Sequence, residues 1–266
     1  MVHETHLLSP SAFPKAAQHQ ETLITIAWRH FRRHRLAMAG VVVLAALVLS
    51  AVFVPIATSY DPGKTHMLDR YLPPSMEHPM GTDGLGRDLL LRSMDGGRIS
   101  LLIGLSAMLL AIVIGTAVGA TAGFYGGMTD NLLMRFADIM LTMPTLFVAI
   151  LLTQLLRAGV VPFLSAGIMP IVLVIAATSW MSVSRVVRAA YLAIKQKEFI
   201  EAARAAGATN RRLIIRHILP NAMSPITVAA TLRVGAAIIT ESGLSYLGFG
   251  VQPPTPTWGN MLRNAK

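Results

Sequence analysis

Residues 99–129 read ISLLIGLSAMLLAIVIGTAVGATAGFYGGMT, and this stretch decides the class of fold. It contains no charged side chain and no regular alternation of apolar and polar residues. The hydrocarbon core of a bilayer needs about 20 apolar residues per helix, and lipid offers a backbone no hydrogen-bond partners. We therefore expect these residues to cross a membrane as one helix.

Four other stretches indicate that the chain crosses the membrane repeatedly. Leu36–Ala57, Ile139–Leu156 and Ala158–Ser184 are also uncharged, and Met223–Glu241 is apolar apart from Arg233. Charged residues make up 14% of the chain, against about 25% in soluble domains. The sequence thus predicts an all-α, polytopic helical membrane protein with about five transmembrane helices.

The basic side chains are concentrated before the first expected span and between the fourth and the fifth. Residues 58–98, by contrast, hold five basic and six acidic side chains. Cytoplasmic loops collect Lys and Arg, so we expect residues 1–35 and the loop 185–222 inside and the loop 58–98 outside. The net charge of +10 is then explained by the lipid bilayer of the plasma (inner) membrane, and nucleic acid is not an expected partner.

This topology divides the chain into a cytoplasmic N-terminal tail, residues 1–35, and a transmembrane domain, residues 36–266. Within the tail, one helical face is shared by Leu23, Ile24, Ala27 and Phe31. Such a face is typical of a helix that lies in the membrane interface. A plain N-terminal extension of the first span fits the same pattern.

Small and helix-breaking residues mark two of the expected spans. Gly115, Gly119 and Gly123 recur every four positions, a spacing that lets helices approach closely. We expect them to pack against a neighbouring helix, in this chain or in another. Pro144 lies inside the expected span 139–156, where it either kinks the helix to shape a pathway or only adjusts the packing.

A charged segment, Glu198–Pro220, lies between the fourth and fifth expected spans and reads EFIEAARAAGATNRRLIIRHILP. Its first part is expected to form a helix with one small apolar stripe at helical spacing, made by Phe199, Ala202, Ala203 and Ala206. Small side chains on an exposed stripe let another backbone come close. The stripe therefore favours insertion into the groove of a partner.

A corner and a second helix are expected after this stripe. Gly207 ends the first helix, because glycine readily takes the left-handed conformation found at helix ends, and Thr209 caps the next. The second helix carries on one side Leu213, Ile214, His217 and Ile218. Pro220 is expected to stop this helix or to bend it into the last span. The alternative for the whole segment is a basic amphipathic loop that rests on anionic lipid.

Several chemistries are not expected of this chain. It has no cysteine, which excludes thiolate metal sites and cysteine nucleophiles. Gly63-Lys64-Thr65 lacks the first glycine of a phosphate-binding loop, because Thr58 occupies that position. His3 and His6 are interpreted as incidental. We therefore expect no metal site and no cofactor bound by this chain.

Three segments together resemble the permeases of ABC importers. In the charged segment these are Glu201-Ala202-Ala203, Gly207 and Ile218-Leu219-Pro220. In the outer loop they are Gly81-Thr82-Asp83, Leu85-Gly86-Arg87-Asp88 and Gly97–Leu101. After the last span they are Glu241, Leu244–Gly248, Val251–Pro254 and Trp258-Gly259. The outer segment is similar to that of the C-type (second) permease of dipeptide and oligopeptide importers, a group that also includes nickel and glutathione importers.

The resemblance implies a function and an assembly. A permease subunit of this type forms half of the translocation pathway for small peptides and works by alternating access. Its partners are a homologous B-type permease, two ATPase subunits that hold ATP and Mg, and an extracytoplasmic substrate-binding protein. The docking contacts to an ATPase subunit are then expected from Glu198, Phe199, Glu201, Ala202, Ala203, Ala206, Gly207, Arg211 and Arg212.

Other readings of the chain remain open at this point. The same machinery could import nickel or glutathione. A membrane-embedded enzyme or a proton-coupled carrier would be a different class of protein. Both of these need several ionisable residues at membrane depth. Arg233 and Glu241 are the candidates for the substrate pathway. In the family that the chain resembles, a sixth span usually follows the segment that contains Trp258-Gly259. The sequence here stops at Lys266.

Overall fold

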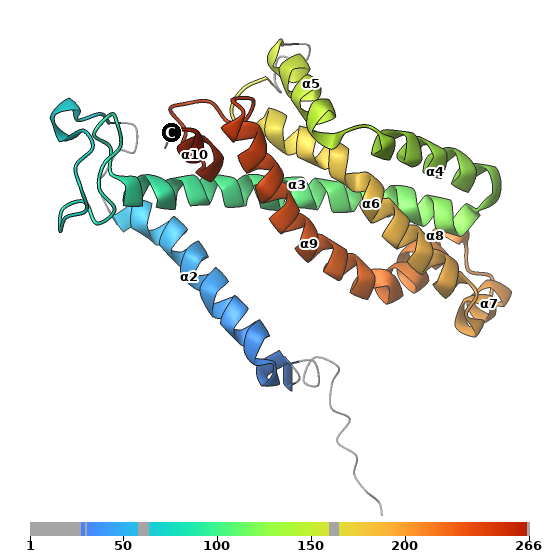
Figure 1. Cartoon of the computed structure of the whole chain (residues 1–266). Coiled ribbons are helices and arrows are strands. Elements are labelled where there is room, and N and C mark those ends of the chain that lie inside the picture. The colour runs from blue at the N-terminus through green and yellow to red at the C-terminus, as the bar shows by residue number, and fades with distance from the viewer. Residues whose placement is uncertain (1–27, 30, 58–63, 160–164, 265–266) are drawn as a thin grey trace, which may run out of the picture. The chain divides into compact units, whose positions relative to one another are not determined.

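The computed structural model of the chain describes residues 28–29, 31–57, 64–159 and 165–264 (Figure 1). His3, His6 and most of the tail 1–35, including Leu23, Ile24 and Ala27, lie outside the described residues. The chain divides into two compact units, residues 1–46 and 47–266. Helix α2 (Arg35–Ala57) belongs to the first unit up to Ala46 and to the second from Leu47.

All regular elements of the described residues are helical, as the sequence predicts. After α2 come the one-turn η1 (Met67–Asp69), α3 (Leu89–Tyr125), α4 (Gly127–Thr142), α5 (Thr145–Arg157) and α6 (Met169–Lys195). The remaining elements are α7 (Glu198–Ala205), α8 (Asn210–Arg212), η3 (Leu213–Ile218), α9 (Leu219–Tyr246) and α10 (Trp258–Asn264). Among the described residues, four helices are long and apolar enough to span a bilayer. The number rises to as many as five if the bent pair of α4 and α5 is one span.

The expected span 139–156 is broken at Pro144, as the kink alternative predicts. Helices α4 and α5 meet at an angle of 95° on either side of Met143 and Pro144. Met143 is extended, with φ −78° and ψ 138°, because the ring of a proline disfavours helical geometry in the residue before it. The break therefore produces either a bent span or a re-entrant element.

The expected span 158–184 is displaced along the sequence. Helix α6 begins at Met169 and continues to Lys195, well beyond the end of the uncharged stretch. It can carry charge there because Arg188 is paired with Asp130 of α4, and Arg185 with Asp138. The uncharged stretch that predicted this span ends at Ser184. It therefore leaves out the last part of α6, where Arg185 and Arg188 are paired with aspartates of α4.

The glycines of α3 bring two helices of this chain into close contact. A Cβ atom at Gly115 would lie 2.6 Å from Val183 Cβ, and one at Gly119 would lie 2.4 Å from the carbonyl oxygen of Ser184. Both neighbours belong to α6, so the predicted glycine packing is confirmed and its partner is in the same chain. Helices α6 and α9 both lie against α3 (Figure 1).

Candidate functional site: the loop between α6 and α9

Helix α7 begins and ends as its sequence dictates. Glu198 and Glu201 lie in its first turn and Arg204 in its last, which places each charge at the favourable end of the helix dipole. Beyond the last turn, Gly207 N–H donates to Arg204 O at 3.0 Å and Ala208 N–H to Ala203 O at 3.0 Å. With Gly207 at φ +82°, this is a Schellman motif, and the predicted glycine corner is confirmed.

The predicted stripe on α7 divides into two faces. Phe199 is 44% exposed, and Ala202 and Ala206 are exposed on the same side. Ala203 instead turns inward and packs on the buried cluster beside Ile200, which is fully buried. The pairing of Ile200 with Ala203 at i and i+3 was the available signal that this second face is the buried one.

The segment after the corner is a helix that continues into α9. Thr209 Oγ1 accepts a hydrogen bond from Arg212 N–H at 3.4 Å, which confirms the predicted cap. Leu213 and Ile218 are fully buried, and Ile214 and His217 are partly buried, so the predicted apolar side is also confirmed.

Pro220 does not stop this helix, and the backbone widens just before it. Residues 213–218 form a π-helical turn, in which Leu219 N–H donates to Ile214 O, five residues back. A proline lacks an N–H and its ring collides with the carbonyl four residues earlier. The wider turn accommodates both effects, so the chain remains helical from Asn210 to Tyr246.

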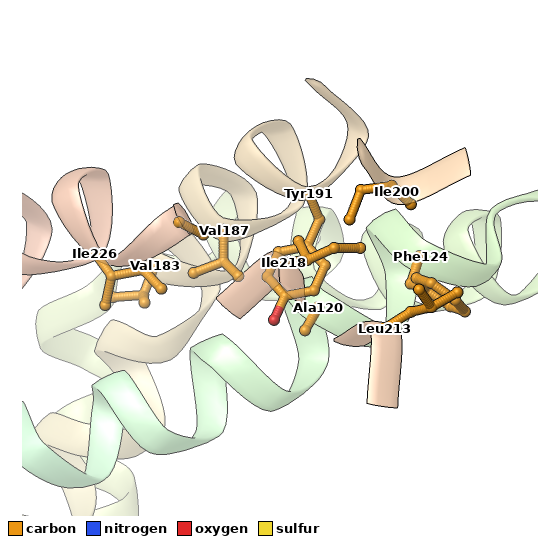
Figure 2. Packing of buried hydrophobic residues seen from close by; sticks show 10 residues of the cluster. Ala120, Phe124, Val183, Val187, Tyr191, Ile200, Leu213, Ile218 and Ile226 are labelled. Atoms are coloured by element: carbon orange, nitrogen blue, oxygen red, sulfur yellow. The ribbon is translucent and has the colours of Figure 1, made fainter. Parts of the chain in front are cut away.

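One apolar cluster anchors the loop to the ends of three long helices (Figure 2). Its fully buried members include Tyr191 of α6, Ile200 of α7, and Leu213 and Ile218 of η3. Phe124, at the end of α3, belongs to the same cluster. The cluster extends along α9 through Ala222 and Ile226. The loop is therefore a packed unit that shares one buried cluster with α3, α6 and α9.

Two hydrogen-bonded contacts reinforce this anchor. Tyr191 Oη donates to Ile214 O at 3.3 Å, which is the carbonyl that also accepts from Leu219 in the π-helical turn. Lys195 Nζ donates to Phe124 O and lies 5.5 Å from the centre of the Phe124 ring. The first contact joins α6 to η3, and the second joins the end of α6 to the end of α3.

The outer surface of the loop combines a small apolar patch with charges of both signs. Around Phe199, Ala202 and Ala206 the exposed charged side chains are Glu198, Glu201, Arg204, Arg211, Arg212 and Arg216. The predicted docking residues lie together in this loop, and Ala203 is the one whose side faces the anchor cluster. Their contacts with another subunit stay a prediction.

The structure does not bring Arg233 and Glu241 together as one site. Arg233 is partly buried, and none of the described residues forms a hydrogen bond or an ion pair with it. Glu241 is fully buried and accepts hydrogen bonds from Ser100 Oγ of α3 at 3.1 Å and from Ser245 Oγ at 2.6 Å. The part of the chain that the structure describes contains no group of three His, Asp or Glu side chains placed to hold a metal.

The serines that hold Glu241 also hold the segment after α9. Ser245 Oγ accepts from Val251 N–H at 3.2 Å, and Ser100 Oγ accepts from Trp258 N–H at 3.3 Å. A serine has a single O–H, and here both serines use it on the carboxylate. Glu241 is therefore the centre of a buried clamp that joins α3, α9 and the start of α10.

In the segment before α3 (residues 64–88, called the outer segment after its expected position), Asp88 caps the helix. Asp88 Oδ1 accepts from Leu91 N–H at 2.9 Å. Asp83 Oδ1 accepts from the backbone N–H groups of Leu85 and Arg87, at 2.9 and 3.0 Å. Burial alone would raise the pKa of Asp83, but the hydrogen bonds from Arg87 and from these backbone groups lower it below the ordinary value of 3.8.

Several long apolar helices with a packed loop between the last two define a polytopic helical membrane protein, and comparison with known proteins supplies the family. Residues 95–266 match the family described as the binding-protein-dependent transport system inner membrane component, and the chain belongs to it. Residues 22–74 match the N-terminal TM domain of oligopeptide transport permease C. The chain is therefore a C-type ABC permease and not an enzyme, and its family works with ATPase and substrate-binding partners.

Individual relatives agree with this family. The chain is 41% identical to the oligopeptide transport system permease protein OppC of Bacillus subtilis over 88% of this chain and 74% of that protein. It is 35% identical to the dipeptide transport system permease protein DppC of Alkalihalophilus pseudofirmus over 99% of this chain and 85% of that protein. A solved chain of the MetNI methionine ABC transporter is 19% identical over 62% of this chain and 83% of that chain, with a TM-score of 0.47.

Proposed function

We propose that the chain forms half of the translocation pathway of an ATP-driven importer of small peptides and works by alternating access. The observation that carries this proposal is the loop between α6 and α9. It presents Phe199, Ala202 and Ala206 to a partner while Ile200 anchors the same helix in the cluster shared with α3, α6 and α9. The names of relatives at 35% and 41% identity support peptide as the cargo.

The loop converts motion of an ATPase subunit into motion of the membrane helices. ATP and Mg bind in the two ATPase subunits, and this chain holds neither. Closure of those subunits pushes on α7 and the Gly207 corner, and the rigid apolar cluster carries the push to three long helices. Because packed cores shift between discrete arrangements and do not deform continuously, the helices rearrange together and change the side on which the pathway is open.

The assembly has a defined orientation. The N-terminus and the loop lie in the cytoplasm beside the ATPase subunits, and the segment 64–88 faces the extracytoplasmic binding protein. The second half of the pathway is a homologous B-type permease. Arg233, which has no partner among the described residues, faces the pathway between the two permeases. Replacement Arg233→Gln is expected to change the range of imported peptides, and an unchanged range would remove Arg233 from the pathway.

The test is reconstitution of the complete assembly in proteoliposomes with the binding protein on the outside. ATP-dependent uptake of a labelled di- or tripeptide is expected, together with co-purification of two ATPase subunits and a second permease. Uptake of nickel or glutathione in place of the peptide would contradict the cargo. Recovery of an active chain without ATPase subunits would contradict the mechanism.

A further inference from the structure

A cavity of about 390 Å³ lies between the outer segment and the segment after α9. One side is formed by Tyr71, Asp83, Arg87 and Arg92, and the other by Pro253 and Pro254. Ligand pockets for small molecules occupy roughly 300–1,000 Å³. The cavity is therefore large enough for the end of a short peptide.

The charged side of the cavity favours an anion. Arg87 and Arg92 are only 8% and 3% exposed, so both guanidinium groups sit in a partly desolvated wall. Arg87 donates to Asp83 Oδ2 from Nε at 2.8 Å, and its Nη2 lies 2.7 Å from the same oxygen. Arg92 Nε lies 3.8 Å from that oxygen. Two guanidinium groups thus lie beside one carboxylate oxygen in this wall.

The donors of Arg87 are not all used inside the protein. A guanidinium group has five N–H donors in a planar fork, and Arg87 directs Nε and Nη2 to Asp83. No hydrogen bond joins its Nη1 to any described residue. Asp83 already accepts backbone N–H groups at its other oxygen. An incoming carboxylate is the group that matches the remaining donors in charge and geometry.

The opposite side of the cavity combines two prolines with Thr255 and Asn260 and is held in place. Pro253 and Pro254 lie in the segment that the Glu241 clamp fixes at Val251 and Trp258. Asn260 closes the same segment, because its side chain donates to Thr255 O at 2.8 Å and accepts from Thr257 N–H at 3.0 Å. A wall fixed before binding lowers the entropy cost of binding.

Tyr71 adds a strained residue to the rim. Its φ is +53°, a left-handed conformation that is uncommon for a residue other than glycine. Its side chain is nevertheless 74% exposed, so core packing does not explain the strain. Strained backbone of this kind is concentrated at ligand-binding and active sites.

We propose that this cavity binds the C-terminal carboxylate of a short peptide, with Arg87 and Arg92 facing the carboxylate and Tyr71 and the two prolines facing the last side chain. This proposal rests on the proposed function, because it takes peptide as the cargo and the outer segment as its side of entry. The site then lies where cargo arrives, before the membrane helices open.

The experiment measures binding of trialanine and of trialanine amide to the complete transporter in nanodiscs, without the binding protein, by equilibrium dialysis. The two peptides differ only in the terminal carboxylate. Trialanine is expected to bind at least about tenfold more tightly than the amide, the size of effect of a charge-assisted hydrogen bond. Arg87→Gln is expected to abolish this difference.

A second variant separates the loss of the ligand contact from the effect of leaving Asp83 without its ion-pair partner. Arg87→Gln/Asp83→Asn removes the cation together with its acidic partner, so the net charge of the wall is unchanged. It is also expected to bind both peptides equally. Equal binding of the two peptides to the unchanged transporter, or a retained difference in both variants, would overturn the proposal.

Two further results separate this proposal from others. If the unchanged transporter binds neither peptide and Arg87→Gln weakens its association with the binding protein, the site takes an acidic side chain of that protein and the peptide assignment is wrong. Failure of the proposed function is recognised independently, as absence of ATP-driven peptide uptake by the unchanged transporter in proteoliposomes.

Discussion

Ile200 of α7 and Tyr191 of α6 are both fully buried in one apolar cluster. Their shared cluster seats the short helix on the end of the long one. It makes the exposed side of the same helix a surface of fixed position. In the proposed mechanism, the exposed face of α7 contacts the ATPase subunit and the buried face transmits the motion.

The two faces can be separated by mutation. Ile200→Ala should remove the anchor and destabilise the loop by about 2–5 kcal/mol, the usual cost of truncating a buried Ile. Phe199→Ala, its exposed neighbour, should leave the thermal unfolding temperature unchanged and reduce recovery of the ATPase subunit on pull-down. The opposite result, a destabilised Phe199→Ala and a stable Ile200→Ala, would mean that the faces are assigned the wrong way round.

The Gly207 corner should tolerate residues according to their backbone preference. A Cβ at this position meets nothing within 4 Å, so the cost of Gly207→Ala is that of the left-handed conformation, about 1–2 kcal/mol. Gly207→Asn should cost less, because Asn adopts that conformation more readily. Peptide transported per ATP hydrolysed is expected to fall in the order Gly, Asn, Ala, and equal coupling in all three would show that the corner does not transmit motion.

Close packing of α3 on α6 predicts a sharp difference between two glycines. Gly119→Ala would place a methyl group 2.4 Å from the backbone oxygen of Ser184, whereas a Cβ at Gly235 of α9 meets nothing within 4 Å. The first variant should lose at least about 1–3 kcal/mol, as expected for an overpacked contact, and Gly235→Ala should not be destabilised. Thermal unfolding in detergent checks both, and equal stability would contradict the helix pairing.

The outer segment should lose stability in acid through Asp83. Since the pKa of this carboxyl is held below its ordinary value of 3.8 by Arg87 and two backbone N–H groups, its ionised form stabilises the fold. That contribution is present above about pH 4 and is lost as the pH falls through the lowered pKa. Hydrogen exchange of residues 81–88 should accelerate in this range, and Asp83→Asn should remove the pH dependence without restoring the protection.

The class of fold could be predicted from the sequence because lipid imposes a simple rule on uncharged stretches. The Gly207 corner and the Thr209 cap could also be predicted, since both depend on local backbone chemistry. A kink at Pro144 was one of two alternatives that the sequence left open, but the angle of 95° could not be predicted. The length of α6 could not be predicted either, because it depends on ion pairs between residues about fifty positions apart, Arg188 with Asp130 and Arg185 with Asp138.

The site was predictable in its location and less so in its detail. The order of residues in the charged segment indicated a docking loop, but the inward turn of Ala203 and the anchor Ile200 depend on the cluster formed with α3 and α6. Glu241 is a candidate for the substrate pathway in the sequence, and its role there stays a prediction. Its two serine partners come from α3 and α9, and only the folded chain reveals the clamp that they form.

Cross-linking from single cysteines tests the docking surface most directly, because the chain has no cysteine of its own. Ala202→Cys places a thiol on the exposed face of α7, and Leu68→Cys places one in the outer segment at a residue that is 98% exposed. With a short thiol-to-amine cross-linker in the assembled transporter, Ala202→Cys is predicted to link to an ATPase subunit and Leu68→Cys is not. A link from Leu68→Cys, or none from Ala202→Cys, would contradict the account.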